Sequence, residues 1–226
     1  MSLPIEFLDK RPSVIALAGS NGAGKSTFHE SFLTDSGLRF INADVLSSSL
    51  NVSAYETAEL ASSLRSALVA QRASFIFETV LSDPVGEKVD QLATYASLSY
   101  TVVLIFIRID NAEESIKRVA MRVSQGGHDV PDEKLLARFE RTQANLQHAI
   151  ERLLYVIVYN NGDLAHPYQL VELYMNEYNK CLSKRSTKRS KAWWSPRIAW
   201  RTSKAMIIRS LESESDAVVL LLLVRQ

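Results

Sequence analysis

The chain has 226 residues with a net charge of +1, and 46% of its residues are hydrophobic and 23% charged. This composition suits one α/β domain with an appendage, and it excludes collagen-like, mucin-like and wholly disordered proteins. The single cysteine, Cys181, excludes a disulfide framework or a multi-cysteine metal site within one chain and indicates a reducing compartment.

The first eleven residues, Met1 to Arg11, contain acids and a proline but no apolar stretch of signal-peptide length. The longest apolar run, Ala217 to Val224, has eight residues, against about 20 for a bilayer-spanning helix. We therefore expect a cytoplasmic protein with no membrane span.

Short apolar runs alternate with longer amphipathic stretches, a pattern typical of a mainly parallel sheet flanked by helices. In chain order, the predicted strands cover residues 14–18, 40–42, 74–78, 101–109 and 155–159. The predicted helices begin near Lys25 or cover residues 55–71, 112–124, 132–154 and 167–182. The sequence thus predicts an α/β fold with a three-layer architecture.

The strongest motif follows the first predicted strand. Its residues match the phosphate-binding loop (P-loop) pattern and its helical continuation: Gly19, Ser20, Asn21, Gly22, Ala23, Gly24, Lys25, Ser26 and Thr27. The glycines let backbone amides turn toward phosphate oxygens, and the following helix N-terminus favours an anion. Lys25 is expected to reach the β- and γ-phosphates of ATP or GTP, and Ser26 is expected to ligate Mg²⁺.

Acidic residues follow the next two strands. Asp44 lies just past the second strand, and Glu78 and Thr79 end the third. In an open α/β sheet such positions face the ligand crevice, where a carboxylate could accept a proton from an acceptor hydroxyl. A helix cap or a solvated turn explains the same residues equally well.

Four arginines, Arg118, Arg122, Arg138 and Arg141, flank a turn at residues 126–131. Arginines on a closing flap could neutralise charge on a transferring phosphate. The alternative is that they lie on solvated helix faces, paired with acids such as Glu114 and Glu140. His128, within the turn, is interpreted as a turn residue because no second histidine is spaced to share a metal with it.

Five segments occur in an order that resembles the zeta toxin family of small kinases. They are Ala18 to Thr27, Ile41 to Asp44, Phe77 to Val80, Arg118 to Pro131 and Tyr159 to Asn161, and the resemblance covers roughly residues 12–165. It implies a P-loop kinase fold and transfer of the γ-phosphate of ATP or GTP to a sugar hydroxyl of a UDP-N-acetylhexosamine, chiefly UDP-N-acetylglucosamine. Many family members are toxins restrained by an antitoxin protein.

The resemblance also assigns roles to individual residues. Asp44 becomes the base toward the sugar hydroxyl, and Glu78 and Thr79 hold the acceptor. One arginine of the pair Arg118 and Arg122 and one of the pair Arg138 and Arg141 clamp phosphate. Within these pairs we favour Arg122 and Arg138. The family usually has Tyr-Asp-Asn where this chain has Tyr159, Asn160 and Asn161.

The C-terminal part differs from the rest in charge. Residues 1–179 carry 15 Lys/Arg and 22 Asp/Glu, a net charge of −7, whereas residues 180–209 carry ten basic residues and no acidic one. We predict a kinase domain over residues 1–183 and a basic extension over residues 184–226. The extension has cations beside Trp193 and Trp194, as single-strand binders do, but charge runs are usually only solvated. Nucleic acid is therefore not the favoured partner.

Two other functions compete with the kinase. An apolar strand ending at Asp110 could belong to a P-loop ATPase that needs no sugar acceptor. A nucleotide-gated protein could bind nucleic acid through residues 184–226, with an affinity that falls steeply as salt rises.

Overall fold

The computed structural model describes residues 10–50, 53–126 and 129–176. The strands are β1 (Ser13–Ala18), β2 (Arg39–Ile41), β3 (Phe75–Thr79), β4 (Thr101–Arg108), β5 (Tyr155–Asn160) and β6 (Gln169–Met175). The helices are α1 (Lys25–Phe28), α2 (Ala43–Leu50), α3 (Ala54–Ala70), α4 (Glu87–Ser97), α5 (Ala112–Ser124) and α6 (Asp132–Arg152). A π-helical turn at His29–Leu33 and a 3-10 turn at Thr34–Ser36 continue α1 toward β2.

The strands form one sheet in the order β2-β3-β1-β4-β5-β6. Neighbours from β2 to β5 pair in parallel, and β6 pairs antiparallel with β5 at the edge. The central strands are buried on both faces, which explains their nearly continuous apolar sequences. The predicted three-layer architecture with a mainly parallel sheet is confirmed.

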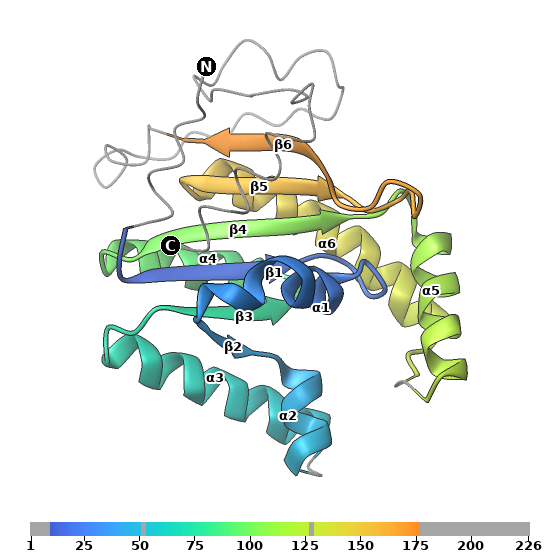
Figure 1. Cartoon of the computed structure of the whole chain (residues 1–226), viewed down its shortest axis with the longest axis horizontal. Coiled ribbons are helices and arrows are strands. Elements are labelled where there is room, and N and C mark those ends of the chain that lie inside the picture. Colours follow the sequence, from blue (N-terminus) through green and yellow to red (C-terminus); the bar gives the residue numbers. More distant parts are fainter. Residues whose placement is uncertain (1–9, 51–52, 127–128, 177–226) are drawn as a thin grey trace.

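Helices cover the two faces of the sheet unequally. On one face, apolar residues of β1, β3 and β4 pack with Leu68 of α3, Leu92 of α4 and Ala149 of α6. On the other face, Phe28 and Leu33, from α1 and the turn after it, pack against the sheet. Figure 1 shows α1 in front of the sheet and α6 behind it. The short helix after the P-loop is therefore fixed by its own apolar side chains.

One predicted element is wrong. The segment from Pro167, expected to be a helix over residues 167–182, contains strand β6 instead. Its side chains pack on both faces, with Val171 on one and Leu173 on the other, and a bulge opposite Val158 interrupts the register. Pairing with the exposed edge of β5 satisfies the backbone groups of both strands, an option that helical spacing in the sequence does not reveal.

Parallel strands place their carboxyl ends at one edge of the sheet. The P-loop follows β1, Asn42 and Asp44 follow β2, and Glu78 lies at the end of β3. Segments distant in the sequence therefore meet at this edge, where open α/β sheets bind their ligands. Among the described residues no helix is long and apolar enough to cross a bilayer.

Candidate functional site

The P-loop adopts a backbone that two of its glycines make possible. Gly19 has a φ of +145°, and a Cβ on it would lie 2.3 Å from the carbonyl oxygen of Ile107. Gly24, at the N-terminus of α1, has a φ of +91°. Side chains at these positions would be strained in the left-handed region or would collide with β4. The loop can therefore curl beside the sheet only with glycine at these positions.

Side chains from outside the P-loop hold its carbonyl groups. Asn161 Nδ2 donates to the carbonyl oxygen of Ala23 at 2.8 Å, and the Tyr168 hydroxyl donates to that of Gly24 at 3.0 Å. The hydroxyl of Ser115, on α5, donates to the carbonyl oxygen of Asn21 at 2.7 Å. These contacts turn the loop carbonyls toward the protein, which leaves the amide face of the loop for an anion.

The sequence departure at residue 160 leaves this arrangement intact. Asn160 Oδ1 accepts a hydrogen bond from the amide of Gly162 at 3.1 Å, a contact that a carboxylate oxygen makes equally well. The loop contact comes from Asn161, the residue that the family pattern retains.

Arg118 supports the P-loop from α5. Its Nε lies 2.7 Å from Glu114 Oε1 in an ion pair, its Nη2 donates to the carbonyl oxygen of Gly162 at 3.2 Å, and its side chain is 8% exposed. A Cβ added to Gly22 would lie 2.9 Å from the Cβ of Arg118, so the P-loop packs closely against this residue. The guanidinium group of Arg118 therefore binds both a carboxylate and a backbone carbonyl within the protein.

Glu78 contacts the side chains of two P-loop residues, Lys25 and Ser26. Its Oε2 accepts a hydrogen bond from the Ser26 hydroxyl at 2.9 Å, and its Oε1 lies 3.6 Å from Lys25 Nζ. Lys25 is only 6% exposed and also donates to the carbonyl oxygen of Ser20 at 2.9 Å. The acid at the end of β3 therefore lies directly against the P-loop.

The charges around Lys25 place three of the expected residues near its ammonium group. Burial lowers the pKa of Lys25, while the carboxylates of Glu78 and then Asp44 oppose this shift and Arg122 adds to it. The ammonium group of Lys25 therefore lies in the field of two carboxylates and one further cation.

Asp44 lies in the first turn of α2 with its side chain exposed. Its backbone amide donates to Asn42 Oδ1 at 2.8 Å. Asn42 in turn donates from Nδ2 to Glu78 Oε2 at 2.8 Å. The sequence reasoning passed over Asn42, although it stands inside the segment that resembles the zeta toxin family.

Thr79 ends β3 directly after Glu78, and the arginine candidates lie on helices α5 and α6. The Thr79 hydroxyl accepts from the amide of Leu81 at 3.1 Å. Arg122, on α5, is exposed, and Arg138, on α6, is half-buried. Arg141 donates from Nε to the carbonyl oxygen of Ser82 at 2.8 Å, a contact within the fold. Like Arg118, Arg141 therefore donates to a backbone carbonyl of the fold. His128 lies outside the described residues.

The oxygen atoms at Ser26 suit a magnesium ion. Oxygen atoms are the ligands that Mg²⁺ prefers. Because the Ser26 hydroxyl donates its hydrogen bond to Glu78, the lone pairs of its oxygen are left to coordinate an ion. Within the described ranges no group of three or more His, Cys, Asp or Glu could hold a metal. A site of this kind fits an ion that takes its remaining ligands from phosphate and water.

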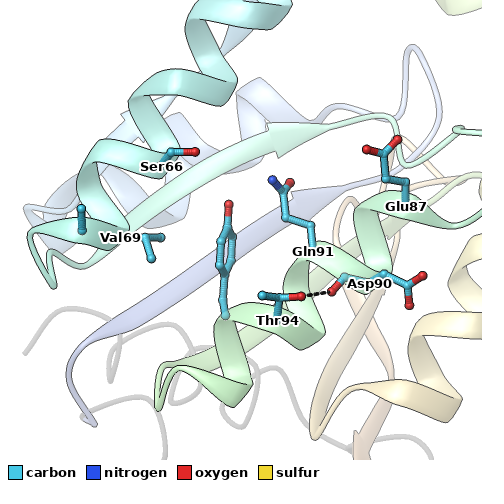
Figure 2. A pocket seen from close by; sticks show the side chains of 8 residues that line it. Ser66, Val69, Glu87, Asp90, Gln91 and Thr94 are labelled. Atoms are coloured by element: carbon cyan, nitrogen blue, oxygen red, sulfur yellow. Dashed lines mark hydrogen bonds between the residues drawn. The ribbon is translucent and has the colours of Figure 1, made fainter.

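A pocket of about 520 Å³ lies between α3 and α4. Figure 2 shows Ser66 and Val69 of α3 across from Gln91 and Thr94 of α4, with the Thr94 hydroxyl bonded to the carbonyl oxygen of Asp90. None of the lining residues belongs to the P-loop or to the acidic centre around Glu78. The expected chemistry therefore lies elsewhere.

The predicted basic extension over residues 184–226, with Trp193 and Trp194, lies outside the described residues. Ser115 and Tyr168, which bind the P-loop carbonyls, were missed by sequence reasoning because no motif marks them.

The sequence profile described as Zeta toxin matches residues 5–170. Among solved structures, a chain of the AvrRxo1-ORF1:AvrRxo1-ORF2 complex with sulphate ions is 20% identical, with a TM-score of 0.61; the match covers 76% of this chain and 62% of that one. The same complex with ATP gives a TM-score of 0.60 at 20% identity, covering 76% and 61%. The PezAT toxin-antitoxin system of Streptococcus pneumoniae gives 0.55 at 18% identity, covering 73% and 72%.

This chain thus spans about 62% of the length of the first of these relatives. Identities of 18 to 20% show a shared fold. Comparison with curated proteins finds no significant match.

Proposed function

The chain belongs to the zeta toxin family, and from this membership we propose that it is a kinase of nucleotide sugars. It transfers the γ-phosphate of ATP or GTP to a hydroxyl of a UDP-N-acetylhexosamine, with UDP-N-acetylglucosamine as the favoured acceptor. The observation that carries the proposal is the cluster of Lys25, Ser26 and Glu78, with Asp44 close enough to act on the Lys25 charge.

The P-loop binds the donor nucleotide. Its amides, over Gly19 to Thr27, surround the phosphates, and Lys25 contributes a positive charge beside the β- and γ-phosphates. Mg²⁺ would be held by Ser26 with the support of Glu78, and it would neutralise phosphate charge.

Asp44 acts as the general base. Its exposed carboxylate accepts the proton of the acceptor hydroxyl, whose oxygen forms the new bond to the γ-phosphorus. The bond between the γ-phosphorus and the bridging oxygen breaks, and ADP or GDP leaves with that oxygen. The negative charge of Asp44 opposes the lowering of the Lys25 pKa by burial, which supports a position of Asp44 beside the transferred group.

Arg122 and Arg138 neutralise charge on the transferring phosphoryl group. Within each pair we propose these two; Arg118 and Arg141 donate to carbonyl oxygens of the fold. The positive charge of Arg122 also contributes to the lowered pKa of Lys25. Guanidinium groups beside the phosphoryl group stabilise a transition state whose negative charge spreads over the equatorial oxygens.

Glu78 and Thr79, at the carboxyl end of β3, hold the acceptor. Both lie at the edge of the sheet where the P-loop and α2 also begin, which supports an acceptor site beside Asp44.

We also propose a protein partner and a place of action. AvrRxo1-ORF1 is solved together with AvrRxo1-ORF2, and PezAT is a toxin-antitoxin system. By analogy, this chain is a toxin held in check by an antitoxin, and it acts in the cytoplasm, where nucleotide sugars are available as acceptors.

A mass-spectrometric transfer assay tests the proposal. The full chain is incubated with ATP or GTP, Mg²⁺ and a panel of nucleotide sugars, and Lys25→Ala serves as the blank. A phosphorylated nucleotide sugar formed by the wild type and absent from the blank supports the kinase and names its acceptor. Nucleotide binding without phosphate gain by any acceptor would refute it, and turnover of ATP without an acceptor would favour an ATPase.

A further inference from the structure

Asn42 connects the two acidic residues of the site. Its side chain is nearly buried, at 5% exposure. Nδ2 donates to Glu78 Oε2 at 2.8 Å, while Oδ1 accepts from the amides of Asp44 at 2.8 Å and Val45 at 3.4 Å. One side chain thus holds the end of β3 and the N-terminus of α2 together.

These contacts require a carboxamide. Aspartate or serine would accept the amides at the helix N-terminus equally well, so capping alone does not explain the residue. The contact with Glu78 needs a donor at the other end of the same group. Aspartate would place an oxygen against the Glu78 carboxylate, and the shorter serine would not span both partners.

The connection continues to the P-loop. Glu78 accepts from Ser26 on the same oxygen that accepts from Asn42, and its other oxygen lies 3.6 Å from Lys25 Nζ. A continuous series of polar contacts therefore runs from the phosphate-binding residues through Glu78 and Asn42 to the backbone of Asp44.

We propose that Asn42 is a positioning residue for phosphoryl transfer. It holds the N-terminus of α2, and with it the Asp44 carboxylate, in a fixed position relative to the P-loop. This role rests on the proposed function, in which Asp44 is the base. An exposed side chain on a short helix needs such a tie, because small displacements of a catalytic group reduce the rate strongly.

A double-mutant cycle with Asp44 tests the role. In the wild-type background, Asn42→Ser lowers the transfer rate by about 10- to 100-fold, while nucleotide affinity stays within roughly threefold. In an Asp44→Asn background the same substitution costs less than about twofold, because the group that it positions is already disabled. Equal losses in both backgrounds, or no loss in the wild type, would overturn the proposal.

Asn111 offers a matched control. It caps α5, where its Oδ1 accepts from the amide of Glu114 at 2.8 Å, as Asn42 does for α2. Asn111→Asp and Asn42→Asp are the same chemical change at two helix caps, but Asn111 is exposed whereas the buried Asn42 donates to the Glu78 carboxylate. Asn111→Asp is expected to keep wild-type transfer while Asn42→Asp loses it. Wild-type transfer by Asn42→Asp would refute the contact with Glu78 as the reason for Asn42.

Backbone hydrogen exchange provides a readout that needs no acceptor. In NMR spectra of the full chain, the Asp44 amide stays protected in Asn42→Asp and exchanges faster in Asn42→Ala. If the wild type phosphorylates no nucleotide sugar, the proposed function fails, and this exchange still decides whether Asn42 holds α2. Unchanged protection of Asp44 in a folded Asn42→Ala variant would refute the positioning role.

Discussion

The P-loop and the groups assigned to the chemistry are built in opposite ways. The loop is fixed by Ser115 of α5 and by Asn161 and Tyr168, both from the segment between β5 and β6, which bind its carbonyl oxygens. The proposed base Asp44 and the proposed clamp Arg122 are exposed side chains on helices at the edge of the sheet. Anion binding thus depends on a preorganised backbone, whereas the transfer step depends on side chains that can approach an acceptor.

If this comparison holds, substitutions in the two regions change different quantities. Those at the exposed side chains lower the rate of transfer and spare nucleotide affinity. Those at the loop contacts weaken nucleotide binding first.

Asp44→Asn gives the largest expected effect. The amide keeps the shape of the side chain but cannot accept the proton, so transfer falls by roughly 10²- to 10⁴-fold. Nucleotide affinity, measured by calorimetry, stays near that of the wild type because the P-loop is untouched. A variant that transfers phosphate at the wild-type rate would remove Asp44 from the mechanism.

Arg122→Ala is expected to lower the transfer rate by about 100-fold, the range seen when one group that stabilises the transition-state charge is removed. Single-turnover kinetics at saturating nucleotide measure it. Lys117→Ala removes a positive charge from the same helix, α5, and serves as the control with unchanged transfer. Equal losses in both variants would indicate a general effect of charge and not a contact with phosphate.

Asn161→Ala acts on the loop. It leaves the carbonyl oxygen of Ala23 without its buried donor, a loss worth about 1–3 kcal/mol, so nucleotide affinity falls about tenfold. Asn160→Asp is the control and keeps affinity, because its carboxylate still accepts from Gly162. If Asn161→Ala slowed transfer without weakening nucleotide binding, the separation between the two regions would be wrong.

Tyr168→Phe gives the smallest effect. Loss of the hydroxyl that binds Gly24 costs about 0.5–1.5 kcal/mol, which lowers nucleotide affinity severalfold at neutral pH. Burial raises the pKa of Tyr168 above its usual value near 10. The hydroxyl therefore stabilises the fold fully below about pH 10 and loses this contribution as pH rises through the raised value.

Thermal unfolding measured from about pH 8 to pH 11 checks this sign. The difference in unfolding midpoint between wild type and Tyr168→Phe should shrink only at the alkaline end. A difference that shrinks on acidification would contradict the assignment.

The P-loop, the order of most elements, the acid after β2 and the acid at the end of β3 could be predicted because each depends on local pattern. The apolar runs at β1 and β4 are buried on both faces, and the glycines of the P-loop match its backbone. Strand β6 could not be predicted in this way, because it forms by pairing with the free edge of β5. Nor could the sequence show that Arg118 and Arg141 donate to carbonyl oxygens of the fold, since these contacts depend on which segments lie nearby.

The sequence by itself therefore determined the type of fold and the residues that carry charge and phosphate-binding backbone. The tertiary structure alone decided which of them meet. Glu78, which the family resemblance assigns to the acceptor, lies against Lys25 and Ser26, and Asn42 ties it to the backbone of Asp44. Hydrogen bonds act over about 3 Å, so contacts between residues 25, 42 and 78 exist only because three parallel strands end at the same edge.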